Sequence, residues 1–460
     1  MTTLWSGRFD SAPDAAAFEF GASFRFDRRL FEDEVIGSLA WGRALASAGV
    51  LSGDEARQIE DALAALLERG RSDPAFVDGP DEDVHSFVER LLVEQLGDTG
   101  RRLHTGRSRN EQVSLDLRLY LRRRIPPLQR LVAGVVDALA AQAEAAGDAL
   151  MPSFTHFRPA QPILVAHFFL SHAAPLRRDC ARLDGARMES DALPLGSGAI
   201  AGTAYAIDVD ALARDLGFSR VVDNSMDASS DRDFAATFLY ACALTMVHLS
   251  RLAEDLIILC GDEHHFFELS DALSTGSSMM PQKKNPDPLE LVRGKSGRAI
   301  GHLIGLLTTI KGLPTGYNKD LQEDKEAVFG AEDTVSGCLA VARSVVNGLT
   351  LDRVRAAAAA SGMLLATDVA DYLVGRGVPF RRAHEIVGAI VRTLIAEGRE
   401  FESLSLEEWR AASDRFESDV AARVTPGASV AAKRTPQSTA PSAVAARLAE
   451  VRQWLERAGR

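Results

Sequence analysis

Apolar residues recur at steps of three and four along several long stretches of this 460-residue chain. This spacing places apolar side chains on one face of a helix, because an α-helix turns once every ~3.6 residues. Similar stripes run through the regions 112–146, 289–310 and 354–373, whereas alternating runs typical of strands are nearly absent. The sequence therefore predicts an all-α fold with a long-helix bundle at its centre. The clearest stripe comprises Leu239, Cys242, Met246, Leu249, Leu252, Leu256 and Leu259.

Proline, glycine and polar residues interrupt this helical pattern. Pro126 and Pro127 fall inside the 112–146 stripe and are expected to bend or break that helix. Several polar stretches are longer than a connection between bundled helices needs, and long ordered loops are usually functional. These stretches are 152–162, 194–202, 274–288 and 313–318.

Charge and cysteine content exclude some classes of protein. Lys plus Arg number 52 and Asp plus Glu number 64, which gives a formal net charge of −12. Such an acidic chain is not expected to bind nucleic acid or a membrane surface, because both are polyanionic. The four cysteines form no C-x-x-C pair, and no secretory leader or membrane span is readable. We therefore expect a soluble cytoplasmic protein.

The most informative loop lies at 276–287, with the sequence Gly-Ser-Ser-Met-Met-Pro-Gln-Lys-Lys-Asn-Pro-Asp. Flexible Gly and Ser residues, two adjacent lysines and an Asn beside Pro make it cationic and rich in hydrogen-bond donors. Such a loop can close over a carboxylate and stabilise a developing oxyanion. By composition alone, a solvated linker between helices explains the stretch equally well.

Three further signals have ordinary structural alternatives. His156 lies among Pro152, Pro159 and Pro162, so its segment is not expected to be a helix interior. The glycines of the 196–202 stretch are similar to a phosphate loop, but the third is one residue late and no strand precedes it, so we favour a tight turn. The acidic and histidine residues at 81–85 and 263–265 lack metal-site spacing. We expect no metal and no organic cofactor.

The order of residues in these loops resembles that of the fumarase/aspartase superfamily, whose members release fumarate. The 282–287 segment is similar to that of the argininosuccinate lyase family, which includes the lens protein δ-crystallin. The departures are Glu111, where Asp is usual, and Arg158-Pro159 after His156. Further stretches that resemble the family are 4–9 (with Ser6 where Gly is usual), 81–85, 103–112, 151–156, 160–162, 230–234, 317–326 and 382–388.

The resemblance implies the cleavage of argininosuccinate to arginine and fumarate, a step of arginine biosynthesis. This β-elimination requires a base at carbon, donors around the resulting aci-carboxylate and an acid for the leaving nitrogen. The family positions imply Ser277 as the base, His156 as the general acid and Glu290 as the carboxylate that orients His156. From the residues alone, His156 is the natural base, since histidine titrates near neutrality. The two assignments remain open.

The resemblance also implies which residues hold the substrate. One set contacts carboxylates, and a second set contacts the amino-acid end of argininosuccinate. The first set is Ser108, Asn110, Thr155, Lys283 and Asn285. The second set is Ser23, Arg109, Tyr317, Gln322 and Lys325.

The implied architecture is a homotetramer of chains with three helical domains, at 1–108, 109–358 and 359–460. The central domain would supply the tetramer core, and the motifs around Asn110, His156 and Ser277 would reach each site from three different subunits. An apolar stripe on several helices fits this, since such stripes need a partner. Two alternatives remain: another fumarate-releasing lyase such as adenylosuccinate lyase, or a non-catalytic structural protein like some δ-crystallins.

Overall fold

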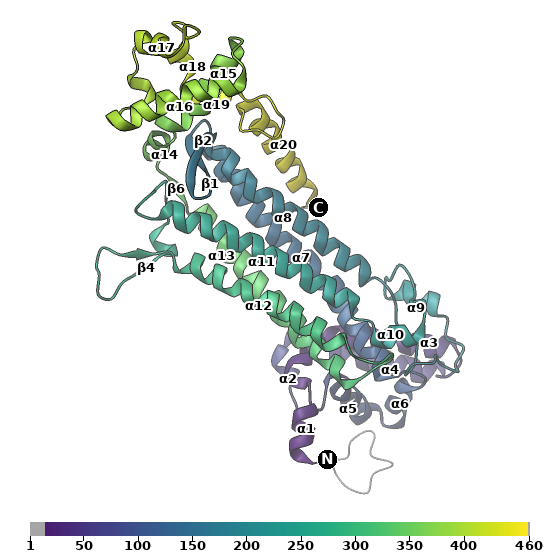
Figure 1. The fold of residues 1–460 in the computed structure, drawn as a ribbon. Coiled ribbons are helices and arrows are strands. Elements are labelled where there is room, and N and C mark those ends of the chain that lie inside the picture. Colours follow the sequence, from purple (N-terminus) through teal and green to yellow (C-terminus); the bar gives the residue numbers. More distant parts are fainter. Residues whose placement is uncertain (1–13, 459–460) are drawn as a thin grey trace. The chain divides into compact units, whose positions relative to one another are not determined.

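The computed structural model describes residues 14–458 and shows a protein built almost entirely of helices (Figure 1). The predicted all-α fold class is confirmed. The motif at 4–9 lies outside the described residues. The chain divides into two compact units. Unit 1 comprises Met1–Leu128, Ala181–Leu244 and Gly297–Val335, and unit 2 comprises Gln129–Cys180, Thr245–Ser296 and Ser336–Arg460.

Three of the five long helices, α7, α11 and α12, follow predicted apolar stripes, whereas the predicted 354–373 stripe is divided among shorter helices. The helix α7 is continuous over 38 residues, so the break expected at Pro126 and Pro127 is absent. An interior proline costs about 3 kcal/mol. Ile125 and Leu128, at 0% and 2% exposure, are fully buried. Burial of each of these side chains contributes about 1.5–3 kcal/mol, which offsets the cost of the prolines. The long helices are α7 (Arg109–Ala146), α8 (Val165–Glu189), α11 (Asp233–Cys260), α12 (Asp287–Ile310) and α13 (Asp324–Asn347).

Shorter helices of unit 1 pack around an aromatic cluster. The rings of Phe24 and Phe87 stack at 5.0 Å, and Phe76 meets Phe87 at 5.7 Å. The helix α4 begins with a capping box, in which Ser52 and Glu55 satisfy each other's backbone N–H groups. These helices are α1 (Ala15–Gly21), α2 (Phe24–Asp27), α3 (Phe31–Ser47), α4 (Gly53–Ser72), α5 (Val84–Leu96), α6 (Asp98–Arg101), α9 (Val209–Asp215) and α10 (Ser225–Ser230).

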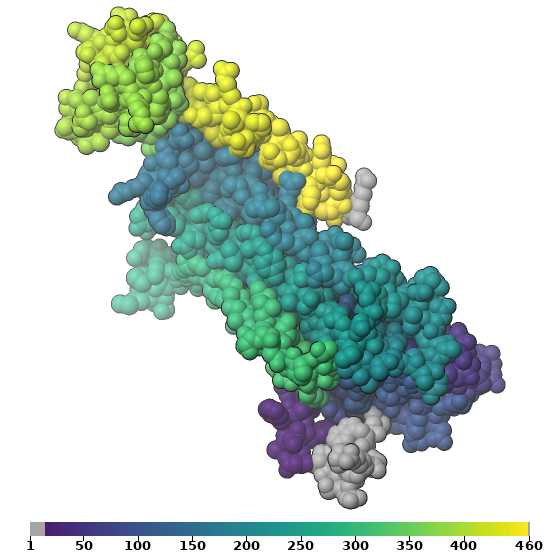
Figure 2. Space-filling view, turned by 45° about the vertical axis from the view of Figure 1, so that its right-hand side comes forward, coloured from purple at the N-terminus to yellow at the C-terminus, as the bar shows by residue number. Residues whose placement is uncertain are grey.

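The C-terminal helices of unit 2 form a separate hydrophobic cluster around Trp409 and Phe416, whose rings lie 4.8 Å apart. The last helix, yellow in Figure 2, packs on the unit 2 parts of α7 and α8, because Arg452 pairs with Glu144 and Trp454 stacks on Arg177. These helices are α14 (Arg353–Ala359), α15 (Ala366–Gly375), α16 (Phe380–Glu397), α17 (Leu406–Ala412), α18 (Val420–Arg423), α19 (Pro426–Ala432) and α20 (Pro441–Ala458).

The strands of unit 2 are short and antiparallel. The hairpin of β1 (Leu150–Thr155) and β2 (Arg158–Leu164) occupies a stretch that the sequence predicted to be a loop. Its prolines are tolerated because both strands are sheet edges, and a bulge interrupts the register between Pro152 and Phe154. The other pairs are β3 (Phe267–Glu268) with β6 (Thr350–Leu351) and β4 (Thr275–Gly276) with β5 (Lys284–Asn285).

Single-turn 3-10 helices complete the described secondary structure, at Arg28–Leu30, Pro74–Phe76, Arg102–His104, Asp271–Leu273, Lys319–Glu323, Gly362–Leu365 and Phe401–Ser403. Among the described residues, no single helix is long and apolar enough to cross a membrane. The segments Arg353–Ala359 and Gly362–Gly375, bent by 59°, pass that test of length and composition only when they are taken together.

Candidate active site

The residues predicted to form the site fall into two groups, one in each unit. The unit 1 group is Ser23, Ser108, Arg109, Asn110, Tyr317, Gln322 and Lys325. The unit 2 group is Thr155, His156, Ser277, Lys283, Asn285 and Glu290.

Thr155 and His156 lie at the tip of the β1–β2 hairpin. Thr155 pairs with Arg158, and the two residues between them turn the chain. His156 and Phe157 both adopt left-handed backbone conformations, with φ of 54° and 58°. This is the backbone that a two-residue hairpin turn requires, and it costs a residue with a Cβ roughly 1–2 kcal/mol. His156 at this turn is exposed.

A cavity of about 640 Å³ lies beside this turn. It is lined by the hairpin and by the parts of α8 and α11 that belong to unit 2, and His156, His167 and His264 are among its residues. Burial lowers the pKa of His167, which keeps that imidazole neutral. The cavity is therefore an apolar-walled space with imidazole nitrogens at its edge, and it is large enough for a small molecule.

Ser277 begins the loop that joins β4 to β5. Its hydroxyl oxygen accepts hydrogen bonds from the backbone N–H groups of Met279, at 3.2 Å, and Met280, at 3.0 Å. Two donors directed at one oxygen favour the ionised form of a hydroxyl. Ser277 is partly exposed, and Met279 near the loop tip is 87% exposed.

The two adjacent lysines of this loop have different surroundings. The Nζ of Lys284 lies 2.7 Å from Glu268 and 2.9 Å from Asp271, so this ammonium group anchors β5. In the part of the chain that the structure describes, Lys283 makes no ion pair and its side chain is exposed. Asn285 is fixed at the base of the loop, where its Nδ2 lies 3.5 Å from the Thr275 hydroxyl. Lys283 is the lysine that remains available for an anionic ligand.

The catalytic residues expected from the resemblance are not joined within one chain. Among the described residues, no hydrogen bond or ion pair links His156 to Ser277 or to Glu290. Glu290 lies exposed in the first turn of α12, and neither it nor Ser277 lines the cavity beside His156. The structure thus presents an imidazole and a hydroxyl on two separate exposed loops of unit 2.

In unit 1, Ser23 is buried and strongly hydrogen-bonded. Its hydroxyl donates to Asp27 at 2.5 Å, and its N–H donates to the carbonyl of Glu82 at 2.7 Å. The second oxygen of Asp27 accepts the N–H of Val84 at 3.0 Å. Burial raises the pKa of Asp27, and the Ser23 hydroxyl opposes that shift. These bonds connect α2 to the segment that precedes α5.

Arg109, the first residue of α7, points to the same segment. Its guanidinium group donates to Asp83 at 3.2 Å and to Ser86 at 2.9 Å, and it lies 3.7 Å from Glu82. Asp83 also caps α5 by accepting the N–H of Ser86 at 2.7 Å. The arginine side chain is therefore oriented before any ligand binds.

Lys325 belongs to a buried ion network that the sequence did not reveal. Its Nζ donates to Asp324 at 2.9 Å, and Asp324 also pairs with Arg232. Burial raises the pKa of Tyr317 to about 12, and the nearby Arg232 opposes that rise. Gln322 donates to the carbonyl of Gly21 at 3.2 Å, next to the Ser23 segment. Arg232 and Asp324 lie within stretches that resembled the family, which was the available signal for them.

The unit 1 group also contains the start of α7. The N–H of Asn110 lies 3.3 Å from the Ser108 hydroxyl, and its side-chain amide donates to the carbonyl of Ala199 at 3.0 Å. These contacts place hydroxyl and amide groups at the N-terminus of a long helix, where an anion is favoured. The unit 1 group can therefore bind carboxylate and amino-acid groups.

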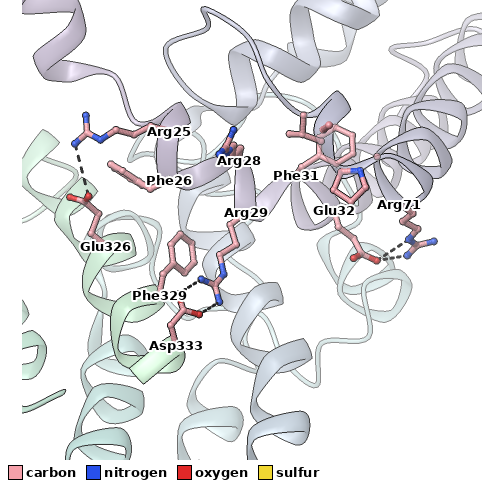
Figure 3. Close-up of a pocket in the computed structure, with 14 residues that line it drawn as sticks. Arg25, Phe26, Arg28, Arg29, Phe31, Glu32, Arg71, Glu326, Phe329 and Asp333 are labelled. Carbon is pink, nitrogen blue, oxygen red and sulfur yellow. Dashed lines mark hydrogen bonds and ion pairs between the residues drawn. The ribbon is translucent and has the colours of Figure 1, made fainter. Parts of the chain in front are cut away.

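A larger cavity in unit 1, of about 980 Å³, contains none of the predicted residues (Figure 3). It is lined by several arginines, but acidic partners already neutralise them. Arg29 lies 2.8 Å from Asp333, Arg71 pairs with Glu32, and Arg25 lies 4.0 Å from Glu326. These surface ion pairs fit a solvated groove better than an anion site.

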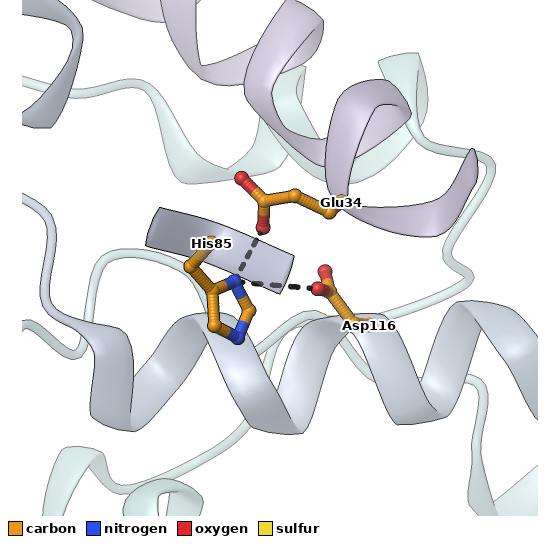
Figure 4. Close-up of side chains that lie close together, drawn as sticks. All are labelled: Glu34, His85 and Asp116. Carbon is orange, nitrogen blue, oxygen red and sulfur yellow. Dashed lines mark hydrogen bonds and ion pairs between the residues drawn. The ribbon is translucent and has the colours of Figure 1, made fainter. Parts of the chain in front are cut away.

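The described residues contain one cluster with the geometry of a metal site, Glu34, His85 and Asp116 of unit 1, whose ligand atoms lie within 4.8 Å of one another (Figure 4). Glu34 already accepts from His85 Nδ1 at 2.7 Å and from Gln112 at 2.8 Å. Neither oxygen of Asp116 has a hydrogen-bond partner, although Oδ2 lies 3.6 Å from His85 Nδ1, and the residue is fully buried. Burial and the adjacent Glu34 raise the pKa of Asp116 well above its usual range. The nearby positive charge of Arg107 disfavours a cation, so a proton on Asp116 fits the cluster best.

Two family comparisons cover most of the chain. The family described as Lyase matches residues 7–301, and the family described as Argininosuccinate lyase C-terminal matches residues 363–431. The argininosuccinate lyase of Desulforudis audaxviator is 46% identical over 458 residues, which cover 99% of this chain and 100% of that protein. The argininosuccinate lyase of a Roseiflexus species (strain RS-1) is 48% identical over 459 residues, which cover 98% and 100%.

Among solved structures, the chain is similar to an EDDS lyase in complex with formate. The TM-score is 0.82 at 26% identity, over 98% of this chain and 93% of that one. A variant of EDDS lyase with bound fumarate gives the same values. A 3-carboxy-cis,cis-muconate lactonizing enzyme from Pseudomonas putida, at 20% identity and a TM-score of 0.75, shares the fold.

The buried carboxyl of Asp116 gives a stability prediction. Because its pKa is raised in the folded state, its contribution to stability is present at low pH and declines as pH rises above the unfolded value of about 3.9. We expect the melting temperature of Asp116→Asn relative to the parent to increase between pH 5 and pH 8. Parallel thermal melts of both proteins measure this. A difference that falls with increasing pH would contradict a protonated Asp116.

Proposed function

The chain belongs to the argininosuccinate lyase family of the fumarase/aspartase superfamily, and from this premise we propose that it cleaves argininosuccinate to arginine and fumarate. One observation carries the proposal: relatives named for this activity are similar along essentially the whole chain, at 46% identity over 99% of it. All candidate catalytic residues are also present. The proposal includes a place in arginine biosynthesis and a cytoplasmic location, which the absence of paired cysteines supports.

The proposed reaction begins with the removal of a proton from the carbon next to a substrate carboxylate. The electron pair moves onto that carboxylate as an aci-carboxylate, and the C–N bond then breaks to give fumarate. His156 would donate a proton to the departing nitrogen, so that the leaving guanidine becomes the guanidinium cation of arginine. Lys283, Asn285, Ser108, Asn110 and Thr155 would hold the substrate carboxylates.

Ser277 is the proposed base. A serine hydroxyl ionises far above neutral pH, so the alkoxide needs strong local stabilisation. The N–H groups of Met279 and Met280 provide part of it, since both already donate to this oxygen. Closure of the loop would exclude water and bring the charge of Lys283 nearer. The alternative, with His156 as base, is favoured by the ordinary pKa of imidazole.

The proposed role of the unit 1 group is to hold the amino-acid end of the substrate. Arg109 is oriented by Asp83 and Ser86, and Lys325 is oriented by Asp324. Ser23, Tyr317 and Gln322 would add neutral hydrogen-bonding groups. Preorganisation of this kind lowers the entropic cost of binding, because these side chains are already fixed before a ligand arrives.

We also propose a homotetramer whose sites combine residues of several subunits. The helix α12 has large apolar side chains in solvent, with Leu291 60% exposed, Ile304 58% and Leu307 45%. Its glycines at 294, 297, 301 and 305 have open space where a Cβ would stand. A face of this kind allows close helix approach, and second copies of this chain are the proposed occupants. Assembly would also supply partners for the exposed loops that carry His156 and Ser277.

Turnover gives a direct test of the proposed function. The purified protein should release fumarate from argininosuccinate, and Ser277→Ala or His156→Asn should each lower kcat by roughly 10²–10⁴-fold. Fumarate absorbance measures the reaction. Melting temperatures should stay within a few degrees, because both side chains lie on solvent-facing loops.

Ser278→Ala, next to Ser277, and His265→Asn, which replaces another left-handed histidine with φ of 50°, are the matched controls. Both should retain activity. Fumarate release from adenylosuccinate alone would establish the other lyase, and a folded protein inactive on both substrates would support the structural alternative.

The two adjacent lysines give the next prediction. Lys283→Gln should lower kcat by about 10²-fold or more, since it removes a cation that would face the developing oxyanion. Lys284→Gln should cost less than about tenfold, because its exposed ion pairs contribute at most about 1 kcal/mol. Steady-state kinetics on both variants test this. An equal loss in the two would contradict the assignment of Lys283.

Subunit mixing tests the shared site. If Ser277 and His156 of one site come from different chains, reassembly of Ser277→Ala with His156→Asn subunits leaves about a quarter of the sites fully native, as random symmetric assembly predicts. Fumarate release should return to about that fraction of the parent activity. Light scattering should show tetramers throughout. Verified mixed tetramers that remain inactive would contradict sharing.

A further inference from the structure

The loop at 194–202 directs backbone N–H groups onto a side chain from another part of unit 1. The N–H groups of Gly196 and Gly198 both donate to Oε2 of Glu111, at 2.8 and 2.9 Å. The other oxygen, Oε1, accepts the N–H of Ser108 at 3.1 Å. Glu111 is completely buried. A single carboxylate thus accepts three backbone donors from two separate segments.

The shape of this loop depends on its glycines. Gly196 and Gly198 have positive φ, of 103° and 58°. A Cβ on Gly198 would lie 2.5 Å from the carbonyl oxygen of Gly202, and one on Gly196 would lie 2.7 Å from Val209. The N–H groups of Gly196 and Gly198 converge on one point in this conformation and form a small anion-binding concavity. The glycine pattern that was similar to a phosphate loop therefore does bind an anion, which is the chain's own carboxylate.

The same carboxylate controls two residues proposed to hold substrate. Ser108 is bound through its N–H to Glu111, and Asn110 donates to the carbonyl of Ala199 within the loop. Asn110 also donates its N–H to the Ser108 hydroxyl. Loss of the Glu111 contacts would release the loop from the start of α7, and the carbonyl that orients the Asn110 amide would move with it.

We propose that Glu111 is a positioning residue, whose carboxylate holds the 196–198 loop against the first turn of α7 and so fixes Ser108 and Asn110 for a substrate carboxylate. This rests on the proposed function, which assigns those two residues to the substrate. Glu111 itself does not contact the reacting atoms. This contact requires the ionised carboxylate, because Oε2 accepts from the N–H groups of the loop while Oε1 accepts from the N–H of Ser108.

The ionisation of Glu111 makes the contact sensitive to pH. Burial raises the pKa of Glu111 to about 7, and the three N–H groups and the charge of Arg107 oppose that rise. Residues 194–202 contain no ionisable side chain. The charged group that acts on the carboxylate is Arg107, which lies in the segment before α7. A proton on either oxygen would face an N–H donor and break that contact. The contact should therefore weaken as pH falls through about 7.

The test compares Glu111→Gln with the parent as the full-length assembled protein. The amide keeps the size of the side chain but turns an NH₂ group toward N–H donors. We expect KM for argininosuccinate to rise roughly tenfold while kcat changes less than threefold, as the loss of hydrogen bonds to a charged group predicts. The parent KM should rise as pH falls from 8 to 6, and the KM of the variant should be high and flat over this range.

A substrate-free measurement accompanies the kinetics. Hydrogen exchange of the peptide that covers 194–202 should be faster in Glu111→Gln. Glu408→Gln is the matched control, because Glu408 accepts the N–H of Ser405 at 2.7 Å in the capping box of α17. The Glu408→Gln variant should change neither KM nor hydrogen exchange in the 194–202 peptide. Glu111→Asp keeps the charge but shortens the reach, so its KM should rise while its pH dependence remains.

The outcomes separate the two proposals. A parent that releases no fumarate from argininosuccinate overturns the proposed function, and with it the link to substrate. An active parent whose KM, pH profile and loop exchange are unchanged in Glu111→Gln overturns the positioning role. Faster exchange with an unchanged KM also overturns it, since the contact would then be structural only. If Glu111→Gln fails to fold, Glu111→Asp decides by KM and loop exchange: an active variant in which both are unchanged overturns the positioning role.

Discussion

Asp324 accepts hydrogen bonds from Arg232 and Lys325, and none of these three residues is more than 2% exposed. Ions this deep are tolerated only when each charge has a partner, and removal of one partner typically costs about 3–5 kcal/mol. These three residues meet at the boundary between η6 (Lys319–Glu323) and α13, because Asp324 is the first residue of α13. The positions of Gln322 and Tyr317 depend on this arrangement.

Two further buried carboxylates of unit 1 also have hydrogen-bond donors as partners. Glu34 gathers donors from α5 and α7, and Glu111 gathers backbone N–H groups from a loop and from the start of α7. Each buried carboxylate connects segments that are distant in sequence, so the candidate binding residues lie on the first turn of α7 with little freedom.

The sequence predicted α7, α11 and α12, because the 3.6-residue period of their apolar residues is a local property, but it indicated neither α8 nor α13. It failed where tertiary packing outweighs local preference, as at Pro126 and Pro127 inside α7, and in the β1–β2 hairpin, whose prolines lie on open strand edges. The candidate site residues came from motif order rather than from physics. Nothing in the sequence distinguished Lys283 from Lys284, since the difference arises from acidic partners at 268 and 271, and nothing indicated that Glu111 would occupy the 196–198 loop.

The two groups of candidate residues differ in how they are held, and this difference bears on assembly. In unit 1 most of these residues are hydrogen-bonded to neighbouring groups, and all are buried or partly buried. In unit 2 His156 stands on a strained turn and Ser277 on a loop whose tip is exposed. Strained backbone such as that of His156 persists where the surrounding structure or a function requires it. Pro152 and Pro162 pair at the base of this hairpin, and in the proposed tetramer the turn would present His156 to another subunit. A proposed catalytic acid supplied in this way would need no partner within its own chain, and the exposed face of α12 would be the surface through which subunits come together.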